Sequence, residues 1–146
     1  MNKISVIVRT KNEERWIGHC LKSIFEQKYE SFEVILVDNC STDNTLLIAS
    51  RFPISNIIKI EEFFPGKAIN LGIEKATGDL IACISAHCIP KNKYWLTNLS
   101  RNIMNAPKVA GVYGRQLPTS FTSDIDRRDL LLVFGRDKRV QIKDYF

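Results

Sequence analysis

Short runs of apolar residues alternate along the chain with segments whose apolar positions recur at helical spacing. Five runs lack polar alternation and predict buried strands, at residues 4–8, 33–37, 57–60, 80–84 and 109–113. The segments between them predict helices, as Ile17, Leu21 and Ile24 show in the first. Strands that alternate with helices indicate βαβ units. We therefore expect an α/β fold, with a mostly parallel sheet covered by helices on both faces.

Polar residues between these runs predict where the first two helices begin. Asn12 is expected to cap the first helix, with Glu13 and Glu14 in its first turn, because carboxylates suit the positive end of the helix dipole. Ser41 or Thr42 is expected to cap the second helix.

Three polar loops follow the first, second and fourth predicted strands, at residues 9–13, 38–43 and 85–88. Parallel sheets bind ligands outside the carboxyl ends of their strands, near the point where the strand order reverses. We therefore expect all three loops to converge on one crevice.

Asp38 ends the second predicted strand and has two interpretations. Its carboxylate could accept hydrogen bonds from a ribose, as acidic residues do in dinucleotide-binding folds, or it could cap the following helix together with Asp43. The chain contains neither G-x-G-x-x-G after its first strand nor G-x-x-x-x-G-K-[ST]. These absences argue against a dinucleotide dehydrogenase and against a P-loop NTPase.

The cysteines Cys20, Cys40, Cys83 and Cys88 contain no C-x-x-C pair. We expect free thiols and a cytoplasmic protein, because no apolar run approaches the length of about 18 residues that spans a bilayer and no signal peptide is evident. Cys83, Cys88 and His87 also suggest a zinc site, although their spacing is weak evidence for one.

The 146 residues carry a formal charge of +5 and are 45% hydrophobic, an ordinary composition for one soluble domain. The positive charge favours anionic partners. Basic residues are scattered and no aromatic–basic motif accompanies them, so we expect no nucleic-acid partner.

Four motifs in register resemble the family 2 glycosyltransferases over about residues 4–115. They are the segments 5–13, 37–43, 70–72 and 76–79, which read SVIVRTKNE, VDNCSTD, NLG and ATGD. The segment 113–118 with Phe134-Gly135 is similar to a bacterial branch described as rhamnosyltransferase-like. The resemblance implies a GT-A (Rossmann-like) fold and an inverting enzyme that uses a nucleotide-sugar donor.

The resemblance also implies a nucleotide site for a UDP- or dTDP-type donor. Asn39 stands where the family often has a second Asp, and Ile69 stands where an Arg is frequent, so one expected phosphate contact is missing. The implied nucleotide-binding residues are Thr10, Lys11, Asn12, Glu13, Asp38, Asn39, Ser41, Lys67 and Asn70.

The family usually ends the fourth strand with Asp-x-Asp, which holds Mg²⁺ or Mn²⁺ against the donor diphosphate. Here the matching residues are Ser85-Ala86-His87. Hard cations prefer carboxylate oxygens, although imidazole suits Mn²⁺ better than Mg²⁺. Three interpretations stay open: His87 ligates a metal, His87 contacts the diphosphate directly without a metal, or the site is degenerate.

In the family the catalytic base is a carboxylate well downstream, so we expect it beyond Phe146. The resemblance thus implies a donor-binding core at residues 1–117 and an incomplete acceptor-side region at residues 118–146. Asp124, Asp126 and Asp129 are late carboxylates that suit a charged helix start better than acid–base work. The apolar run 130–134 predicts self-association if it is exposed.

The leading hypothesis is an inverting glycosyltransferase that acts in cell-surface polysaccharide or glycolipid synthesis. Its acceptor would be a saccharide or a lipid-linked sugar, and a basic surface would favour peripheral contact with the membrane. The alternative is a nucleotide-binding module without transferase activity, because the acceptor half and the base would be missing.

Overall fold

The computed structural model describes residues 2–62, 64–106 and 108–135. The chain divides into two compact units, Met1–Pro107 and Lys108–Phe146. The second unit contains helix α5 (Asp124–Val133). The elements of the first unit are, in order, β1 (Ile4–Thr10), α1 (Ile17–Phe25), β2 (Phe32–Asp38), α2 (Thr45–Ala49), β3 (Asn56–Lys59), α3 (Pro65–Glu74), β4 (Leu80–Ser85) and α4 (Trp95–Met104).

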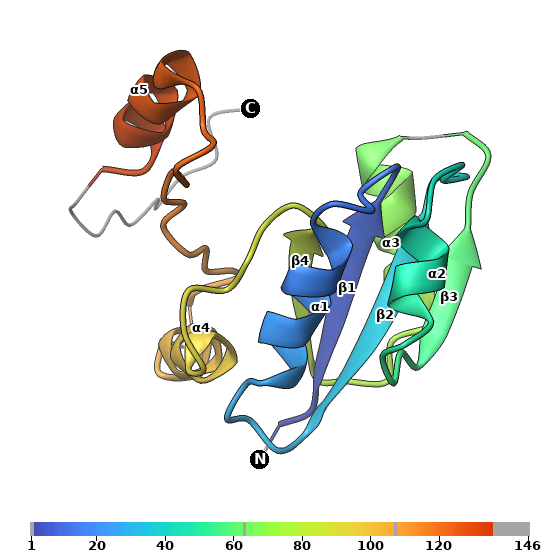
Figure 1. The fold of residues 1–146 in the computed structure, drawn as a ribbon. Coiled ribbons are helices and arrows are strands. Elements are labelled where there is room, and N and C mark those ends of the chain that lie inside the picture. Colours follow the sequence, from blue (N-terminus) through green and yellow to red (C-terminus); the bar gives the residue numbers. More distant parts are fainter. Residues whose placement is uncertain (1, 63, 107, 136–146) are drawn as a thin grey trace. The chain divides into compact units, whose positions relative to one another are not determined.

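The four strands form one parallel sheet in the order β3-β2-β1-β4 (Figure 1). Ile4 of β1 lies opposite Phe32 of β2 and Leu80 of β4, so the three strands start level with one another. The strand order reverses at β1, because β2 and β4 lie on opposite sides of it. The crevice outside β1 and β4 is therefore the expected ligand site of this topology.

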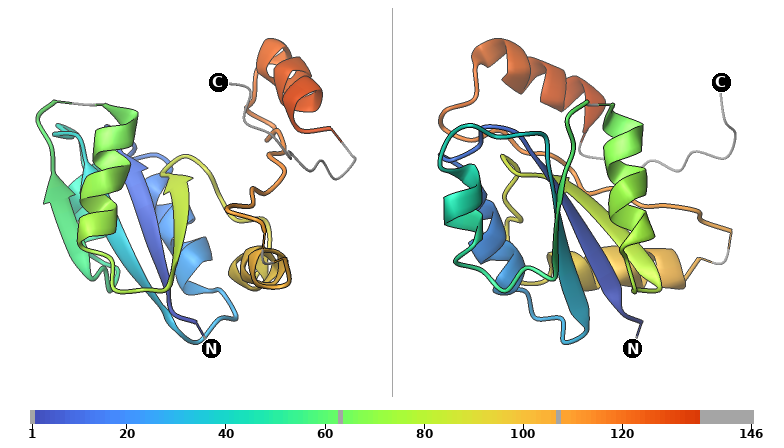
Figure 2. Two further views of the ribbon diagram at one scale, coloured as in Figure 1. Left: turned by 180° about the vertical axis from the view of Figure 1, so that it is seen from behind. Right: turned by 90° about the vertical axis from the view of Figure 1, so that its right-hand side faces the viewer.

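Helices cover both faces of the sheet, which confirms the predicted α/β class. On one face, Val6 and Val8 pack with residues of α1, α2 and α4. On the other face, Ile7 and Val37 pack against α3, and Figure 2 shows α3 on the opposite side of the sheet from α1 and α2. Alternate residues of β1 therefore enter two separate cores, as the period of a strand requires.

The close approach of α3 to β1 depends on a glycine. A Cβ atom at Gly72 would lie 2.6 Å from a methyl carbon of Ile7, which is fully buried. Any larger side chain would push the helix away from the sheet.

The fifth predicted strand is wrong. Residues 109–113 pair with no strand in the part of the chain that the structure describes. The segment contains Gly111, and its Tyr113 is 70% exposed. A short apolar run forms a strand only where a neighbouring strand accepts its hydrogen bonds, and the run alone cannot show whether one is present.

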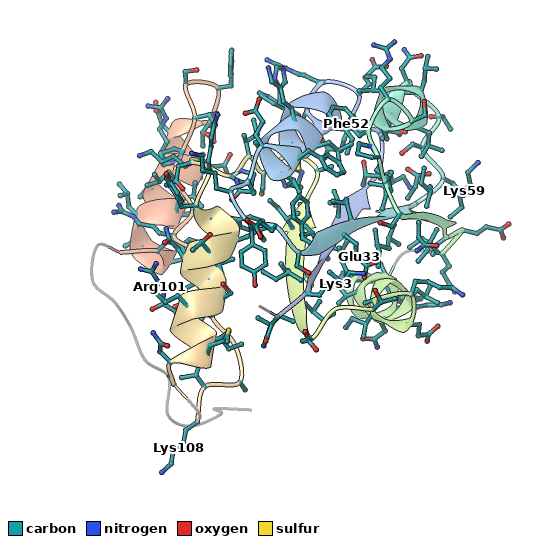
Figure 3. All side chains as sticks on the ribbon, turned by 90° about the horizontal axis from the view of Figure 1, so that it is seen from below. Lys3, Glu33, Phe52, Lys59, Arg101 and Lys108 are labelled. Atoms are coloured by element: carbon teal, nitrogen blue, oxygen red, sulfur yellow. The ribbon has the colours of Figure 1, made fainter. Side chains whose placement is uncertain are left out.

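A hydrogen-bonded carboxylate joins the amino ends of β1 and β2. Glu33 accepts from Lys3 Nζ at 3.2 Å, from Ser5 Oγ at 2.6 Å and from the Thr77 amide at 2.7 Å. Figure 3 labels Lys3, which directly precedes β1, and Glu33 of β2. Burial opposes the ionisation of Glu33, but these hydrogen bonds outweigh it and lower its pKa to about 2. The network fixes the register of the strands far from the crevice.

Helix α5 begins with a capped, charged turn, as its sequence predicts. The Ser123 hydroxyl accepts a hydrogen bond from the Asp126 amide at 3.2 Å and donates one to the Asp126 carboxylate at 2.6 Å. No residue of α5 is buried, and Leu131 and Leu132 are exposed. Within the described ranges, no helix has the length and apolarity that crossing a membrane requires.

Candidate functional site

A cleft of about 380 Å³ lies where the loops after β1, β2 and β4 meet. The topology predicts this meeting, and the lining residues confirm it. They are Arg9, Thr10, Lys11, Glu13, Asn39, Pro65, Ser85 and His87. Six of these eight residues were predicted site residues; Arg9 and Pro65 were not.

Buried polar atoms without partners cluster in this cleft. Thr10 and Asn39 are 5% and 4% exposed, and Thr10 Oγ1 and Asn39 Oδ1 have no hydrogen-bond partner among the described residues. Arg9 Nε is buried without a partner in the same part of the chain. Leaving such an atom unsatisfied costs about 1–3 kcal/mol. Three of them in one cleft indicate a polar ligand that supplies the missing hydrogen bonds.

Asn12 joins the first loop to the second instead of capping α1. Its amide donates to Ser41 Oγ at 2.9 Å, and its side-chain oxygen accepts from the Thr42 amide at 2.8 Å. Asn12 adopts a positive φ of 51°, which Asn tolerates better than most residues. Helix α1 begins only at Ile17. The predicted caps at Asn12, Ser41 and Thr42 are therefore wrong, because these side chains bond across the two loops.

Acidic side chains of the two loops also accept hydrogen bonds from backbone amides of the opposite loop. Asp43 accepts from the Glu14 amide at 3.0 Å, and Glu14 accepts from the Asn44 amide at 3.0 Å. Thr45 Oγ1 accepts from the Glu13 amide at 2.7 Å. Hydrogen bonds that point in both directions hold the two loops at a fixed spacing, so the wall of the cleft is formed before any ligand binds.

Asp38 is buried and bonded within its own loop. Its carboxylate accepts from the Ser41 amide at 3.0 Å and from the Ser41 hydroxyl. Asp38 does not line the cleft. Ser41 lies before α2, so Asp38 does not cap that helix, and its predicted contact with ribose stays a prediction.

Glu13, in the loop after β1, orients His87, in the loop after β4. The Glu13 Oε1 atom lies 2.8 Å from His87 Nδ1, which leaves Nε2 as the second polar atom of the ring. The neighbouring Cys88 side chain and Glu13 raise the pKa of His87 to about 9, although burial acts in the opposite direction. His87 is therefore protonated at neutral pH, and Nε2 presents an N–H donor.

The Arg9 side chain connects β1 with β4. Arg9 and Ser85 are partners in the strand register, and the guanidinium donates to Ser85 Oγ at 3.2 Å. Sequence reasoning placed Arg9 in the polar loop at residues 9–13 but did not name it as a site residue, and the structure includes it in β1. The available signal was a charged residue at the carboxyl end of an otherwise apolar run.

The donor set of the cleft suits an anion better than a divalent cation. Among the described residues, no three His, Cys, Asp or Glu side chains are grouped so that they could hold a metal ion. Ser85 Oγ already accepts a hydrogen bond from Arg9, and Glu13 is bonded to His87. A neighbouring guanidinium also repels a cation. The zinc site suggested by Cys83, Cys88 and His87 has no support in this arrangement.

Five predicted residues do not line the cleft: Asn12, Asp38 and Ser41 of its loops, and Lys67 and Asn70 of α3. Lys67 and Asn70 are exposed on α3, and Lys67 Nζ lies 3.9 Å from Glu62. Only Pro65, the first residue of α3, lines the cleft from this helix.

Fold and cleft together define an α/β protein with a polar cleft at the carboxyl edge of a parallel sheet. The chain belongs to the glycosyl transferase family 2, whose model matches residues 5–144. Solved relatives show the same GT-A architecture. The TarS poly(ribitol-phosphate) β-N-acetylglucosaminyltransferase of Staphylococcus aureus, in complex with UDP-GlcNAc, matches with a TM-score of 0.64 and 33% identity. This match covers 81% of this chain and 37% of TarS 1–349.

Two further relatives match most of this chain. A mannosyltransferase of Pyrobaculum calidifontis, in complex with GDP-Man and Mn²⁺, matches with a TM-score of 0.64 and 28% identity over 68% of this chain and 32% of that one. A dolichyl N-acetyl-α-D-glucosaminyl phosphate 3-β-D-2,3-diacetamido-2,3-dideoxy-β-D-glucuronosyltransferase of Methanococcus voltae is 33% identical over 125 residues, or 78% of this chain. The chain spans 39% of that relative's length. The rhamnosyltransferase-like branch stays a prediction.

Proposed function

We propose that the cleft binds the nucleotide diphosphate of a nucleotide-sugar donor of UDP or dTDP type. The protein would transfer the sugar, with inversion, to a hydroxyl of a saccharide or lipid-linked acceptor in cell-surface polysaccharide or glycolipid synthesis. One observation carries the proposal: in a chain of family 2, the predicted loops meet in a cleft whose buried polar atoms lack partners.

The chemistry of the cleft suits the two halves of such a donor. Asn39 Oδ1 is a buried acceptor and requires an N–H or O–H group, which a nucleoside base or ribose offers. His87 and Lys11 bring positive charge to the same cleft. Positive charge stabilises a departing nucleotide diphosphate, so the same groups would lower the barrier to sugar transfer.

An inverting transfer also needs a base that takes the proton of the acceptor hydroxyl. We place this base outside the described residues, since the carboxylates at the start of α5 serve its capped first turn. The complexes of TarS with UDP-GlcNAc and of the Pyrobaculum enzyme with GDP-Man support a nucleotide-sugar donor here. Because the second complex contains Mn²⁺, the effect of Mn²⁺ on nucleotide binding should be measured for this chain.

Thr10→Val tests the donor site with little change in shape. The substitution removes a buried hydroxyl that has no partner in the described chain, so we expect the melting temperature to stay level or rise. Affinity for UDP or dTDP, measured by thermal shift and calorimetry with and without Mn²⁺, should fall about fivefold, in line with one lost hydrogen bond.

Thr97→Val is the matched control, because it removes a hydroxyl that does not line the cleft. Thr97 lies on α4, and its Oγ1 donates to the Lys28 carbonyl at 3.1 Å. It should lower stability slightly and leave nucleotide affinity unchanged. Failure of every nucleotide and nucleotide sugar to stabilise the wild-type chain would refute the proposal. Nucleotide binding without donor hydrolysis or transfer would instead support the alternative, a binding module without transferase activity.

The exposed leucines of α5 extend the proposal to partners. Leu131 and Leu132 are 57% and 67% exposed and form an apolar surface without cover in the described unit. We propose that this surface mediates self-association or contact with a membrane. Sedimentation of Leu132→Asp against the wild-type chain, with and without anionic vesicles, tests both, and identical behaviour of the two chains would contradict both.

A further inference from the structure

Arg9 is a partly buried cation that lines the cleft. Its guanidinium donates to Ser85 Oγ at 3.2 Å, and Nε is buried without a hydrogen-bond partner in the described part of the chain. Arg9 and Cys83 lie on the same face of the sheet, because Arg9 is paired with Ser85, two residues after Cys83 on β4. The pairing of β1 with β4 therefore holds Arg9 beside Ser85.

No carboxylate neutralises this charge in the residues that the structure describes. The ion pairs found there involve Lys3, Lys67, His87 and Arg128, and none includes Arg9. A guanidinium held away from water normally has an anionic partner. It also offers several N–H donors in a planar fork that matches phosphate oxygens. A bound anion would supply the acceptor that Nε lacks.

The neighbours of Arg9 narrow the kind of anion. Thr10 and Asn39 present buried polar oxygens without partners in the same cleft. Asn39 Oδ1 requires a donor, which an inorganic diphosphate at neutral pH supplies poorly. A ligand that combines phosphate oxygens with N–H or O–H groups satisfies both requirements. A nucleoside diphosphate has both.

We propose that Arg9 binds the donor diphosphate and supplies fixed positive charge at the sheet edge where the family resemblance places a divalent metal. The inference rests on the proposed function, since it names the group that recognises the diphosphate of the same donor. It goes beyond that function by assigning the role to a β1 residue and by making the binding of the diphosphate largely independent of metal.

The test compares UDP with uridine on the 146-residue chain by isothermal titration calorimetry, in EDTA and in Mn²⁺. If UDP fails to bind the wild-type chain, dTDP and thymidine replace the pair. Arg9→Gln should weaken UDP binding about 30-fold, as expected for loss of a charge-assisted pair of hydrogen bonds, and change uridine binding less than about twofold. Arg9→Lys should cause an intermediate loss, because it keeps the charge and loses the fork.

Arg101→Gln is the matched control, since it makes the same change at an exposed arginine of α4 that does not line the cleft. It should change UDP binding by less than about twofold, because exposed charges outside the cleft are screened by solvent. Melting temperatures of all variants establish that each is folded, and Arg9→Lys keeps the comparison valid if Arg9→Gln does not fold.

The outcomes separate the inference from the proposed function. Wild-type binding of UDP that Arg9→Lys and Arg9→Gln leave unchanged would overturn the inference and leave the donor site intact. Equal losses for uridine and UDP would also overturn it, as would a wild-type affinity for UDP that falls more than about tenfold in EDTA. A wild-type chain that binds neither UDP nor dTDP would overturn the proposed function and the inference together.

Discussion

Asp43 provides a quantitative test of the claim that the two loops hold the cleft wall in place. Its carboxylate accepts hydrogen bonds from the Glu14 amide at 3.0 Å, the Thr45 amide at 3.0 Å and the Thr45 hydroxyl at 2.5 Å. Burial works against ionisation, but these hydrogen bonds prevail and lower the pKa of Asp43. Asp43→Ala removes all three bonds, so the amides of Glu14 and of the fully buried Thr45 lose their side-chain acceptor.

The expected cost is about 2 kcal/mol. A hydrogen bond to a charged group contributes about 1.5–3 kcal/mol when buried, and loss of a helix cap costs about 0.5–2 kcal/mol. Asp43 is partly exposed, so water replaces some of what is lost. For a unit of this size, the melting temperature should fall by about 8 °C. Urea denaturation followed by circular dichroism measures the free energy directly.

Asp129→Ala on α5 is the control for removing an acidic side chain. Asp129 is exposed and pairs only at the surface, with the adjacent Arg128 at 3.4 Å, so its loss should cost less than about 0.5 kcal/mol. A cost for Asp43→Ala as small as that of the control would refute the reasoning. So would unchanged hydrogen exchange of the Glu14 amide, because the donor would then have another acceptor.

Three further predictions follow from contacts elsewhere in the first unit. Glu33→Gln should lower the free energy of unfolding by about 2 kcal/mol at pH 7. Because the pKa of Glu33 in the folded chain is about 2, against an ordinary value of 4.5, this difference should vanish as the pH falls from about 4.5 to 2. A loss of stability that does not depend on pH, measured by urea denaturation, would contradict the hydrogen-bond network around Glu33. Gly78→Ala should lower the free energy of unfolding by about 1–3 kcal/mol, because the added Cβ atom would lie 2.7 Å from a backbone nitrogen. Gly66→Ala is the control and should cost nothing, since a Cβ atom there has no atom within 4 Å. Equal melting temperatures for the two variants would be inconsistent with this packing. NMR titration of His87 should give a pKa near 9, and Glu13→Gln should lower this pKa. The stabilisation that the His87–Glu13 pair gives the folded chain should be complete below about pH 6.5 and lost as the pH rises towards 9. A His87 pKa that Glu13→Gln does not change would show that Glu13 does not orient the ring.

The parallel sheet could be predicted because its signal is local. Runs such as residues 4–8 and 33–37 are apolar without alternation, and the structure buries both faces of β1 and β2. The failure at residues 109–113 has the same origin, since the run is apolar but nothing in it reports whether a partner strand exists. The meeting of three loops at one edge followed from topology, which depends on element order alone.

The roles of individual site residues were harder to predict. Asn12 and Ser41 have the right composition for helix caps, but each bonds to the opposite loop, and such a tertiary contact leaves no mark in local sequence. Arg9 was missed because its distinctive property, a buried guanidinium without a partner among the described residues, depends on the register of β1 with β4. Thr10 and Asn39 were predicted from family resemblance, and the structure adds that their polar atoms are buried without partners in the described chain.

The central claim, that this cleft binds a nucleotide diphosphate, is tested most directly by an amide chemical-shift map of the ¹⁵N-labelled chain titrated with UDP or dTDP. We predict saturable shifts centred on Thr10, Lys11, Asn39 and Ser85, which line the cleft where β1, β2 and β4 end. Shifts confined to the separate cavity of Pro90, Asn92 and Tyr94 would contradict the account, as would the absence of any shift with either nucleotide.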